Sequence, residues 1–572
     1  MSPLPRNTAR TGPALAAVAL ASALVLTACG GSGGDGGGDG AGRKRAKAPA
    51  AGAQAINAQP VAKLRAGGTL NLSVQQWIHQ YNAYQVDGTN GDATAILEQV
   101  EPVLQPRDSH GVPHPDPNYL LSAKVTSKSP LEITYRLNPK ARWSDGKPLS
   151  YRDFAALAKA LDGSDSRYLV ADTSGYDQIA EVSRGGSDQE AVVRFRAPYA
   201  DWQRLFRVLL PAGSIDTPEK FNKGWLEKIP VTAGAWRIAS IDKTTQTVTT
   251  EPDPQWWGAK PRLSSITWRA LQSPAQTEAY LNKEIDETSA ILPEDYKRLV
   301  KAPKTDIRKG ARWDEVHITL GARGPLADLG VRQAVDRAID RKGITTAFAK
   351  DVPVDVAPLD NHFFMPNQKG YEANAGVWGT YDPKAAAKLL DESGWKEGAA
   401  GEPRTKGGKR LTLTYLISAG ASTSAVDQAQ IVQQQLGAVG IGVSIRKVTE
   451  ADYFDKYVNR GNFDLVSFRN VDNIFPSQLF STFQLPRGKQ SFLNFGGVGT
   501  KEIDALLTKA GRETDPDAAR ALYNQADKAI WAEVHSIELY QRPQIIATRA
   551  GLANWGAPGL GDVDYTKVGW VK

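Results

Sequence analysis

Few residues of this 572-residue chain have the types and spacing that covalent or metal chemistry requires. His110 and His114 are close in sequence, but the Gly-Val-Pro between them precludes a helix that would hold both imidazoles on one face. No H-E-x-x-H, P-loop or G-x-S-x-G motif occurs. The stretch 31–36 matches G-x-G-x-x-G, but it neither follows a predicted strand nor opens a predicted helix, so a dinucleotide site is excluded. The residues therefore predict no enzyme, no cofactor and no metal site.

Cys29 is the only cysteine, so it can form neither an intramolecular disulfide nor a cysteine-based metal site. It follows Arg6, Arg10 and an apolar run, 14–26, which has the length of the apolar core of a signal peptide and is too short to span a bilayer. The Leu-Thr-Ala before it resembles the lipobox of bacterial lipoproteins, in which the cysteine thiol is joined to diacylglycerol. The resemblance implies that residues 1–28 are a signal peptide and that Cys29 carries membrane lipid; a chance cysteine in an ordinary signal peptide is the alternative.

Residues 30–67 are rich in glycine, then basic, then rich in Ala, Gln and Pro, a composition that cannot form a core. A glycine-rich chain of this length typically reaches about 30–35 Å. We interpret residues 29–67 as a flexible tether behind the lipidated cysteine. Its basic cluster, 43–47, either contacts anionic lipid headgroups or is simply solvated.

The remaining chain is long enough for roughly three or four domain-sized units. Of all residues 41% are apolar, which is enough to bury a core, and the formal net charge is +7. No block of Lys and Arg approaches the basic stripe of a nucleic-acid-binding surface. Nucleic acid is therefore not an expected partner.

From residue 68 onward the sequence alternates between strand-like and helix-like patterns. Alternating apolar residues predict strands at 70–74, 132–137 and 411–416. Helical periodicity predicts helices that follow N-caps at Ser150 and Asp382, one from Val331, and one over 424–439. The mixture predicts an α/β protein of several units.

Several segments, taken in order, resemble the extracytoplasmic solute-binding proteins of peptide/nickel-type ABC importers, family 5. The matching stretches are YRLNPKARWSDGKP at 135–148, GAWRI at 234–238, EPDPQWWGAKP at 251–261, VRQAVDRAIDR at 331–341, YDPKAAAKLL at 381–390 with GW at 394–395, and IELY at 537–540. Each stretch alone is weak evidence, whereas all of them in family order identify the chain as a member. Their physical content is mostly structural, and the Trp256–Trp257 pair favours packing over ligand stacking.

The resemblance implies a two-lobed periplasmic-binding-protein-like fold of the cluster C type. Two α/β lobes are joined by a hinge that the chain crosses twice, and an extra subdomain is inserted in lobe I. We expect lobe I at 68–311 and, after the return crossing, at 537–572, with lobe II at 312–536. The ligand is captured between the lobes, and closure excludes water from it.

Ligand residues carry over only where the motif matches. Peptide-binding members hold the substrate's α-ammonium with the Asp of a G-W-x-x-D-Y-x-x-P segment. The corresponding segment here is Arg469-Asn470-Val471-Asp472-Asn473-Ile-Phe-Pro476. It keeps the Asp and the Pro, whereas Arg469 stands in the Trp position and Asn473 in the Tyr position. The resemblance implies Asp472 as the amine anchor, and a loop cap is the alternative.

Asp87 and Arg469 each have two possible roles in the sequence analysis. Asp87, Gly88 and Thr89 fall where the family's peptide-lining loop follows the first strand, so Asp87 either meets the same ammonium or is a turn residue. Arg469 either pairs with a ligand carboxylate or neutralises Asp472, and the second role would argue against a peptide ligand.

The leading hypothesis is a monomeric, lipid-anchored receptor on the extracytoplasmic face of a bacterial cell membrane, which captures oligopeptides and delivers them to an ABC permease. One alternative is a non-transport lipoprotein that uses the same fold to regulate envelope or glycolipid synthesis. Another is a receptor for oligosaccharide or metal chelate. The sequence does not separate these ligands.

Overall fold

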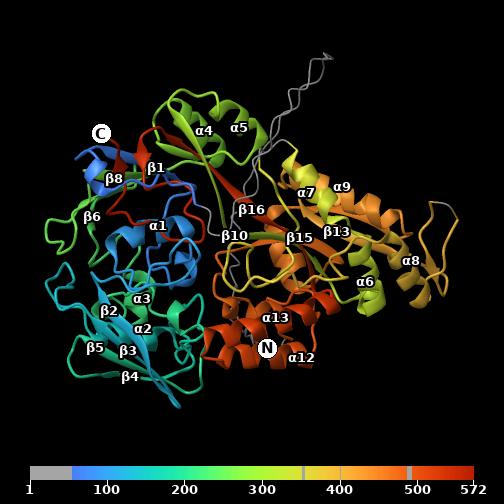
Figure 1. Cartoon of the computed structure of the whole chain (residues 1–572), viewed down its shortest axis with the longest axis horizontal. Helices are drawn as coiled ribbons and strands as arrows, with labels where there is room; N and C mark the ends of the chain where they lie inside the picture. Colours follow the sequence, from blue (N-terminus) through green and yellow to red (C-terminus); the bar gives the residue numbers. More distant parts are fainter. Residues whose placement is uncertain (1–53, 351–353, 400, 486–492) are drawn as a thin grey trace, which may run out of the picture.

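The computed structural model describes residues 54–350, 354–399, 401–485 and 493–572. Two bodies lie side by side, and two long strands, β10 and β16, run between them (Figure 1). Cys29, the basic cluster and the glycine-rich stretch lie outside the described residues. None of the helices in the described ranges has the length and apolar content needed to span a membrane.

Residues 54–67, which the sequence analysis assigns to the tether, differ from that expectation. Leu64 is buried, Ala55 bridges Ala557, and the Asn57 side chain donates a hydrogen bond to the Leu552 carbonyl. This segment therefore lies on the folded body, because apolar and hydrogen-bonding partners reach it from the C-terminal end of the chain, almost 500 residues away.

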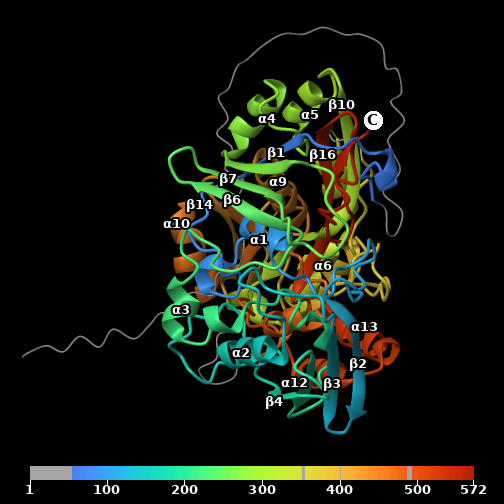
Figure 2. The same cartoon turned by 90° about the vertical axis from the view of Figure 1, so that its left-hand side faces the viewer.

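Lobe I contains two four-stranded sheets around one hydrophobic core. The first has the order β1-β8-β7-β6, from Thr69–Val74, Ser265–Ala270, Thr247–Pro252 and Trp236–Asp242. The second has the order β2-β3-β5-β4, from Leu120–Lys128, Leu131–Leu137, Glu190–Phe195 and Ile179–Arg184. Its helices are α1 at Gly91–Val100, α2 at Tyr151–Leu161 and α3 at Pro218–Lys223. Figure 2 shows the β2–β3 hairpin extending at one end of this lobe.

The predicted cap of α2 is confirmed. The Ser150 amide donates to the Asp153 carboxylate at 2.9 Å, and the two residues form a capping box. The apolar side chains Phe154 and Leu157 of this helix are fully buried. Local sequence was sufficient here because caps and periodicity act within one or two turns.

The central sheet has six strands in the order β14-β13-β15-β10-β16-β9. The strands are Gly442–Val448, Thr412–Ser418, Leu465–Val471, Thr305–Leu320, Ser536–Arg549 and Glu287–Ser289. β10 and β16 pair antiparallel over most of their length, with two register shifts. At one end they meet α4 at Ser273–Leu281 and α5 at Pro293–Leu299, and at the other end β15 pairs with β10 (Figure 1).

Lobe II is built on β13, β14 and β15 and is covered by helices. These are α6 at Leu329–Ala338, α7 at Arg341–Ala349, α8 at Pro383–Glu392 and α9 at Thr423–Gly437. A second core gathers around α12 at Lys501–Arg512 and α13 at Pro516–Glu533. Short elements complete the chain: α10 at Glu450–Asp452, α11 at Phe480–Phe483, β11 at Thr405–Lys406, β12 at Lys409–Arg410, β17 at Leu552–Ala553 and β18 at Gly569–Trp570.

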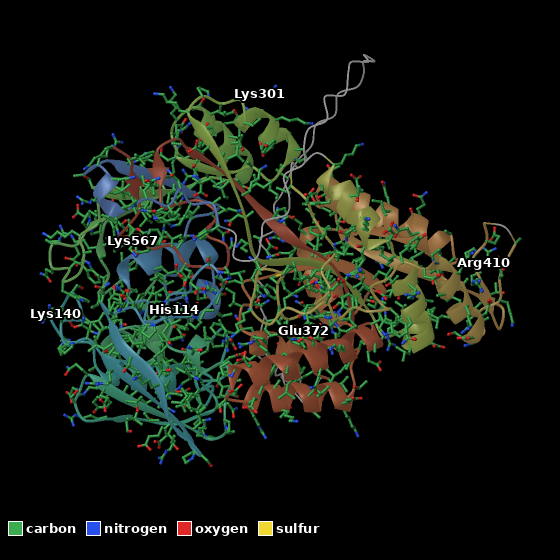
Figure 3. All side chains as sticks on the ribbon, viewed as in Figure 1. His114, Lys140, Lys301, Glu372, Arg410 and Lys567 are labelled. Atoms are coloured by element: carbon green, nitrogen blue, oxygen red, sulfur yellow. The ribbon has the colours of Figure 1, made fainter. Side chains whose placement is uncertain are left out.

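The helix predicted at Asp382 is also confirmed: its carboxylate accepts from the Ala385 amide at 2.9 Å, and Pro383 occupies the first turn. Gly394 follows with φ +82°, the left-handed conformation expected just after a helix. Charged side chains are spread over the outside of the molecule, with Lys140, Lys301 and Arg410 at three separate edges (Figure 3).

Candidate functional site

The Asp472 carboxylate lies at the end of β15, where this strand faces lobe I. The residue has φ +57°, a left-handed conformation that Asp tolerates better than most side chains, and it turns the chain away from the sheet. Its amide donates to the Trp313 carbonyl of β10 at 2.8 Å. The Asp472 side chain is 57% exposed, so the strand end presents a charged group to solvent.

Arg107 of lobe I is the partner of Asp472. Its Nη1 lies 3.0 Å from Asp472 Oδ1, and its other donors go to Asp562, with Nε at 3.1 Å and Nη2 at 2.7 Å from Oδ1. Arg207 adds contacts to Asp562 at 2.9 Å and to Glu98 at 2.7 Å. Asp472 is thus neutralised from within the protein, but by Arg107 and not by Arg469.

The Asp562 carboxylate fixes Arg107 in this position. Burial opposes its ionisation, but Arg207 and Arg107 outweigh burial and hold the pKa of Asp562 well below its usual range. The ionised carboxylate takes two side-chain hydrogen bonds and the backbone amide of Arg107. Arg107 therefore has a permanent partner in lobe I and a second, more exposed one in Asp472.

Arg469 pairs with a carboxylate that sequence reasoning did not consider. Its Nη1 lies 3.2 Å from Asp314 Oδ2 on the neighbouring strand β10. Asn470 uses its backbone amide to donate to Glu315 at 3.2 Å, and Val471 lies opposite Asp314 in the ladder. Asn473 is half-buried just beyond the strand. β15 therefore brings the predicted residues Arg469 to Asn473 together at one strand end.

The turn of Asp87, Gly88 and Thr89 is held by local contacts. Gln85 accepts from the Asp87 amide at 2.6 Å and donates to its carboxylate at 3.1 Å. A Cβ at Gly88 would lie 2.0 Å from the Asn82 carbonyl oxygen, so this position requires glycine. Within the described ranges, no hydrogen bond or ion pair joins this turn to Asp472, and the residue that does reach Asp472 from lobe I is Arg107.

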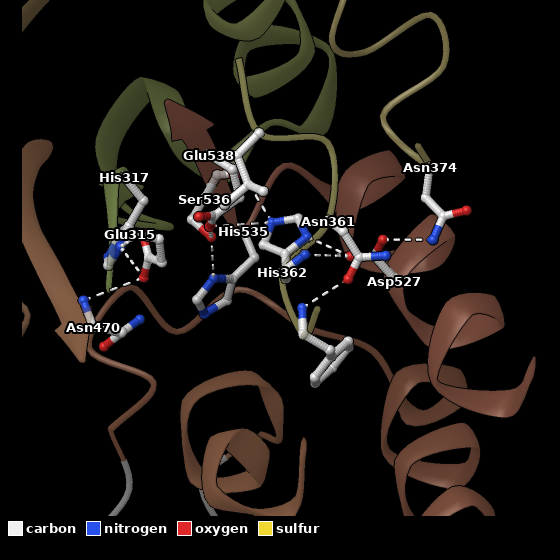
Figure 4. Close-up of polar contacts among 12 residues, drawn as sticks. Glu315, His317, Asn361, His362, Asn374, Asn470, Asp527, His535, Ser536 and Glu538 are labelled. Atoms are coloured by element: carbon white, nitrogen blue, oxygen red, sulfur yellow. Dashed lines mark hydrogen bonds and ion pairs between the residues drawn. The ribbon is translucent and has the colours of Figure 1, made fainter. Parts of the chain in front are cut away.

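A buried network of histidines and carboxyls lies beside β10 and β16, on the side of the sheet opposite to Asp314 (Figure 4). His317 lies opposite Glu538 in the ladder and pairs with Glu315 at 3.0 Å, and His362 pairs with Asp527 at 2.6 Å. These histidines are scattered along the sequence, and the pairing of β10 with β16 brings His317 beside Glu538. Sequence alone contains no information on that pairing.

Glu315, His317 and Glu538 are the one group in the described residues whose ligand atoms are close enough for a metal ion, within 4.8 Å of one another. Burial raises the pKa of Glu538 well above its usual value, and the neighbouring Glu315 raises it further. Glu538 Oε2 is buried without a hydrogen-bond partner among the described residues, and a proton on this carboxyl would relieve the repulsion between Glu538 and Glu315. A proton can therefore take the place that a metal ion would have, and the absence of a metal site stays a prediction.

The other motifs have structural roles. His114 Nε2 contacts Asp108 at 2.9 Å within an exposed turn. Trp256 is buried, and the Trp257 indole donates to the Asn118 carbonyl at 2.9 Å. This confirms the prediction that the tryptophan pair contributes to packing.

Sequence reasoning missed Arg107, Asp562, Asp314 and Arg542. The first three are single charged residues without a local motif, and these partners lie 155 to 455 positions away. Arg542 could have been found from the sequence, because it is a cation two residues beyond the IELY segment, at the expected return crossing between the lobes.

The comparisons with known proteins agree with this architecture. Residues 114–491 match the family profile "Bacterial extracellular solute-binding proteins, family 5 Middle". The oligopeptide-binding protein OppA of Mycobacterium tuberculosis is 37% identical over 525 residues, which cover 90% of this chain and 87% of OppA. A "probable monoacyl phosphatidylinositol tetramannoside-binding protein", LpqW, from the same organism is 26% identical over 404 residues, 65% of this chain and 62% of LpqW.

Two solved structures have the same fold. The periplasmic EDTA-binding protein EppA superimposes with a TM-score of 0.82 at 23% identity, covering 90% of this chain and 98% of EppA. The oligopeptide-binding protein AppA from Bacillus subtilis, in complex with a nonapeptide, has a TM-score of 0.71 at 19% identity, covering 89% of this chain and all of AppA. The expected two-lobed α/β fold of periplasmic binding proteins is confirmed.

The fold and the charged strand end between its lobes thus define a protein that binds solutes. The chain belongs to family 5 of the bacterial extracellular solute-binding proteins. It is a solute-binding protein and not an enzyme.

Proposed function

We propose that this chain is the lipid-anchored receptor of an ABC importer, which captures oligopeptides between its lobes and delivers them to a membrane permease. The observation that carries the proposal is the 37% identity with an oligopeptide-binding protein over 90% of the chain. The exposed Asp472 carboxylate supports it, because a peptide's α-ammonium requires a carboxylate partner where water is excluded.

In this proposal, the α-ammonium of the peptide replaces the Arg107 Nη1–H group as the hydrogen-bond donor to Asp472. Arg107 keeps its contacts with Asp562 when it releases Asp472, so the exchange leaves no buried guanidinium unpaired. Arg469, Asn470, Val471 and Asn473 line the same strand end. The ligand wall on the lobe I side is assigned to Asp87, Gly88 and Thr89, with Asp87 as a turn residue of that wall.

We place the lobe boundaries near 311/312 and 536/537. The first falls inside β10 and the second at the start of β16, the two strands that run between the bodies (Figure 1). A hinge there would let the lobes close on a solute. Lobe I would then comprise 68–311 and 537–572, with residues 54–67 packed against its C-terminal segment. Lobe II would comprise 312–536, and the protein would act as a monomer.

The lipid anchor is assigned to Cys29. Cys29→Ser is expected to abolish incorporation of labelled fatty acid and to move most of the protein from the membrane fraction to the soluble fraction, because the thiol is the attachment atom. Metabolic labelling and cell fractionation measure both effects, with Ser32→Ala as the control that keeps the anchor. Equal labelling of Cys29→Ser would contradict the assignment.

Native mass spectrometry of the full chain, purified in detergent, tests the ligand class, because closed solute receptors often retain what they bind. A series of masses that fragment as peptides is expected. Retention of oligosaccharide or a metal chelate, with no stabilisation by a peptide mixture, would replace the peptide assignment.

A second candidate is a non-transport lipoprotein that regulates envelope or glycolipid synthesis. The likeness to LpqW, which is named as a probable binder of a phosphatidylinositol tetramannoside, favours it. Adjacent permease and ATPase genes would support transport, and an isolated gene would support the regulator.

A further inference from the structure

A second set of contacts joins the two lobes next to the charged strand end. The Tyr199 hydroxyl of lobe I lies 3.0 Å from the Ser477 hydroxyl of lobe II. The Ser477 amide donates to Asp201 Oδ2 at 2.8 Å, and the Ala200 amide donates to the Gly511 carbonyl at 2.8 Å. We call residues 199–201, Ser477 and Gly511, which these hydrogen bonds join, the interlobe clasp.

Lobe I by itself holds Tyr199 in place. The Tyr199 ring stacks on Phe195 of β5, with ring centroids 6.3 Å apart. Arg204 Nη1 donates to the Tyr199 hydroxyl at 3.2 Å and to the Ser174 carbonyl at 2.9 Å, and Arg204 also pairs with Asp172. Because lobe I residues already position the Tyr199 hydroxyl, its contact with Ser477 costs little additional side-chain entropy.

Lobe II contributes backbone groups at two helix ends. Ser477 lies in the first turn of the short helix η8 at Pro476–Leu479, and Gly511 lies in the last turn of α12. The N–H groups of a first turn and the C=O groups of a last turn have no partner within their own helix. Asp201 and Ala200 of lobe I satisfy these groups, and Ala200 also packs against the apolar core around α12 and α13. Separation of the lobes would break all of these contacts at once.

The same loop of lobe II carries the clasp and the proposed ammonium anchor. Arg107 fastens this loop to lobe I at Asp472, whose side chain is 57% exposed, and Asp201 fastens it again at Ser477. Ser477 and Tyr199 are only 6% and 7% exposed. A solute can therefore displace Arg107 from Asp472, but the protein covers the hydroxyl pair of the clasp, whose contacts stay the same whatever solute lies between the lobes.

We propose that the interlobe clasp holds the two lobes together independently of the solute and determines how long a captured solute stays bound. The inference rests on the proposed function, because it requires the lobes to close on a solute, although the clasp itself does not require that the solute is a peptide. All three hydrogen bonds have to break when the lobes separate, so the loss of one should accelerate opening by the same factor for every solute. A typical hydrogen bond changes such an equilibrium by about fivefold.

Hydrogen exchange of the full chain in detergent, without added peptide and read at single residues by electron-transfer fragmentation, tests the clasp. The amides of Ala200 and Ser477, one in each lobe, are expected to be protected in the wild type. Tyr199→Phe removes the hydroxyl and keeps the ring, so it should raise the exchange rate of both amides by about fivefold. Ser477→Ala should have the same effect at Ala200, and the double variant should add nothing, because both substitutions remove the same bond.

Tyr280→Phe is the matched control. The Tyr280 hydroxyl also bonds to a hydroxyl, that of Thr305 at 2.9 Å, but both residues belong to lobe I. This variant should leave exchange at Ala200 and Ser477 unchanged. Three results would overturn the clasp: unprotected amides in the wild type, an effect of Tyr199→Phe no larger than that of Tyr280→Phe, or an effect on Ala200 without one on Ser477.

The dissociation rate of a bound peptide tests the effect on residence time. The probes are tetra-alanine and hexa-alanine, each extended by a C-terminal dansyl-lysine and chased with excess unlabelled peptide in a stopped-flow fluorimeter. Tyr199→Phe should release both probes about fivefold faster than the wild type, and Tyr280→Phe should release them at the wild-type rate. Unchanged release, or different factors for the two probes, would overturn the role in residence time. If neither probe binds, the peptide function fails, and the exchange rates at Ala200 and Ser477 still decide the clasp.

Discussion

Asp472→Ala is expected to weaken oligopeptide binding by more than tenfold. The closed lobes exclude water from the ligand, so an α-ammonium without its carboxylate would lose both an ion pair and its hydration. Tenfold corresponds to about 1.4 kcal/mol, which is modest for a charge-assisted hydrogen bond of this kind. Isothermal titration with a tetrapeptide retained by the purified protein measures the change.

An N-acetylated form of the same peptide provides the control. Acetylation removes the positive charge, so wild-type protein should lose affinity for the acetylated peptide, and Asp472→Ala should show little further loss. Asp564→Ala, at an exposed position that pairs with Lys567 at 2.9 Å, should behave like wild type. Unchanged affinity of Asp472→Ala for the free peptide would rule out Asp472 as the amine anchor.

Asp562→Ala is expected to lower the free energy of unfolding of lobe I by about 3–5 kcal/mol, because it leaves two largely buried guanidiniums without their shared carboxylate. Arg107 lies 2.7 Å and Arg207 2.9 Å from Asp562, whose side chain is 8% exposed. Urea unfolding followed by tryptophan fluorescence measures the loss.

The pH dependence gives an independent check. The Asp562 pKa is held low in the folded protein, so this residue stabilises the fold above its ordinary pKa of about 4, and the contribution is lost as the pH falls further toward the folded value. The difference between wild type and Asp562→Ala should therefore shrink below about pH 4. The exposed pair of Asp564 offers a comparison, since Asp564→Ala should cost about 1 kcal/mol or less. Equal effects of the two substitutions would show that Arg107 and Arg207 do not depend on Asp562.

Only some of the residues in these predictions could be identified from the sequence. The proposed role of Asp472 came from a short motif, and the structure places this residue at an exposed strand end. Its partner, Arg107, could not be predicted from the sequence. Arg107 and Asp472 are 365 residues apart, and Arg107 and Asp562 are 455 apart, so no local pattern links them.

The sequence by itself was sufficient to predict several helices and the class of the protein. The capping box at Ser150, the proline start after Asp382 and the apolar face of α6 follow from interactions within a few residues, which a sequence displays directly. The ordered motifs indicated the two-lobed fold and a solute-binding function. The lipobox indicated the role proposed for Cys29.

Only the tertiary structure decided how charge is distributed at the site. The pairing of β10 with β15 and β16 places Arg469 and Arg542 on one carboxylate and, on the opposite face, His317 beside Glu315 and Glu538. The pairing of these strands depends on packing over the whole molecule, and a shift of one residue would exchange the two faces. For that reason the short motifs of the chain indicate its family, whereas the partners of Asp472 and Arg469 follow only from the folded structure.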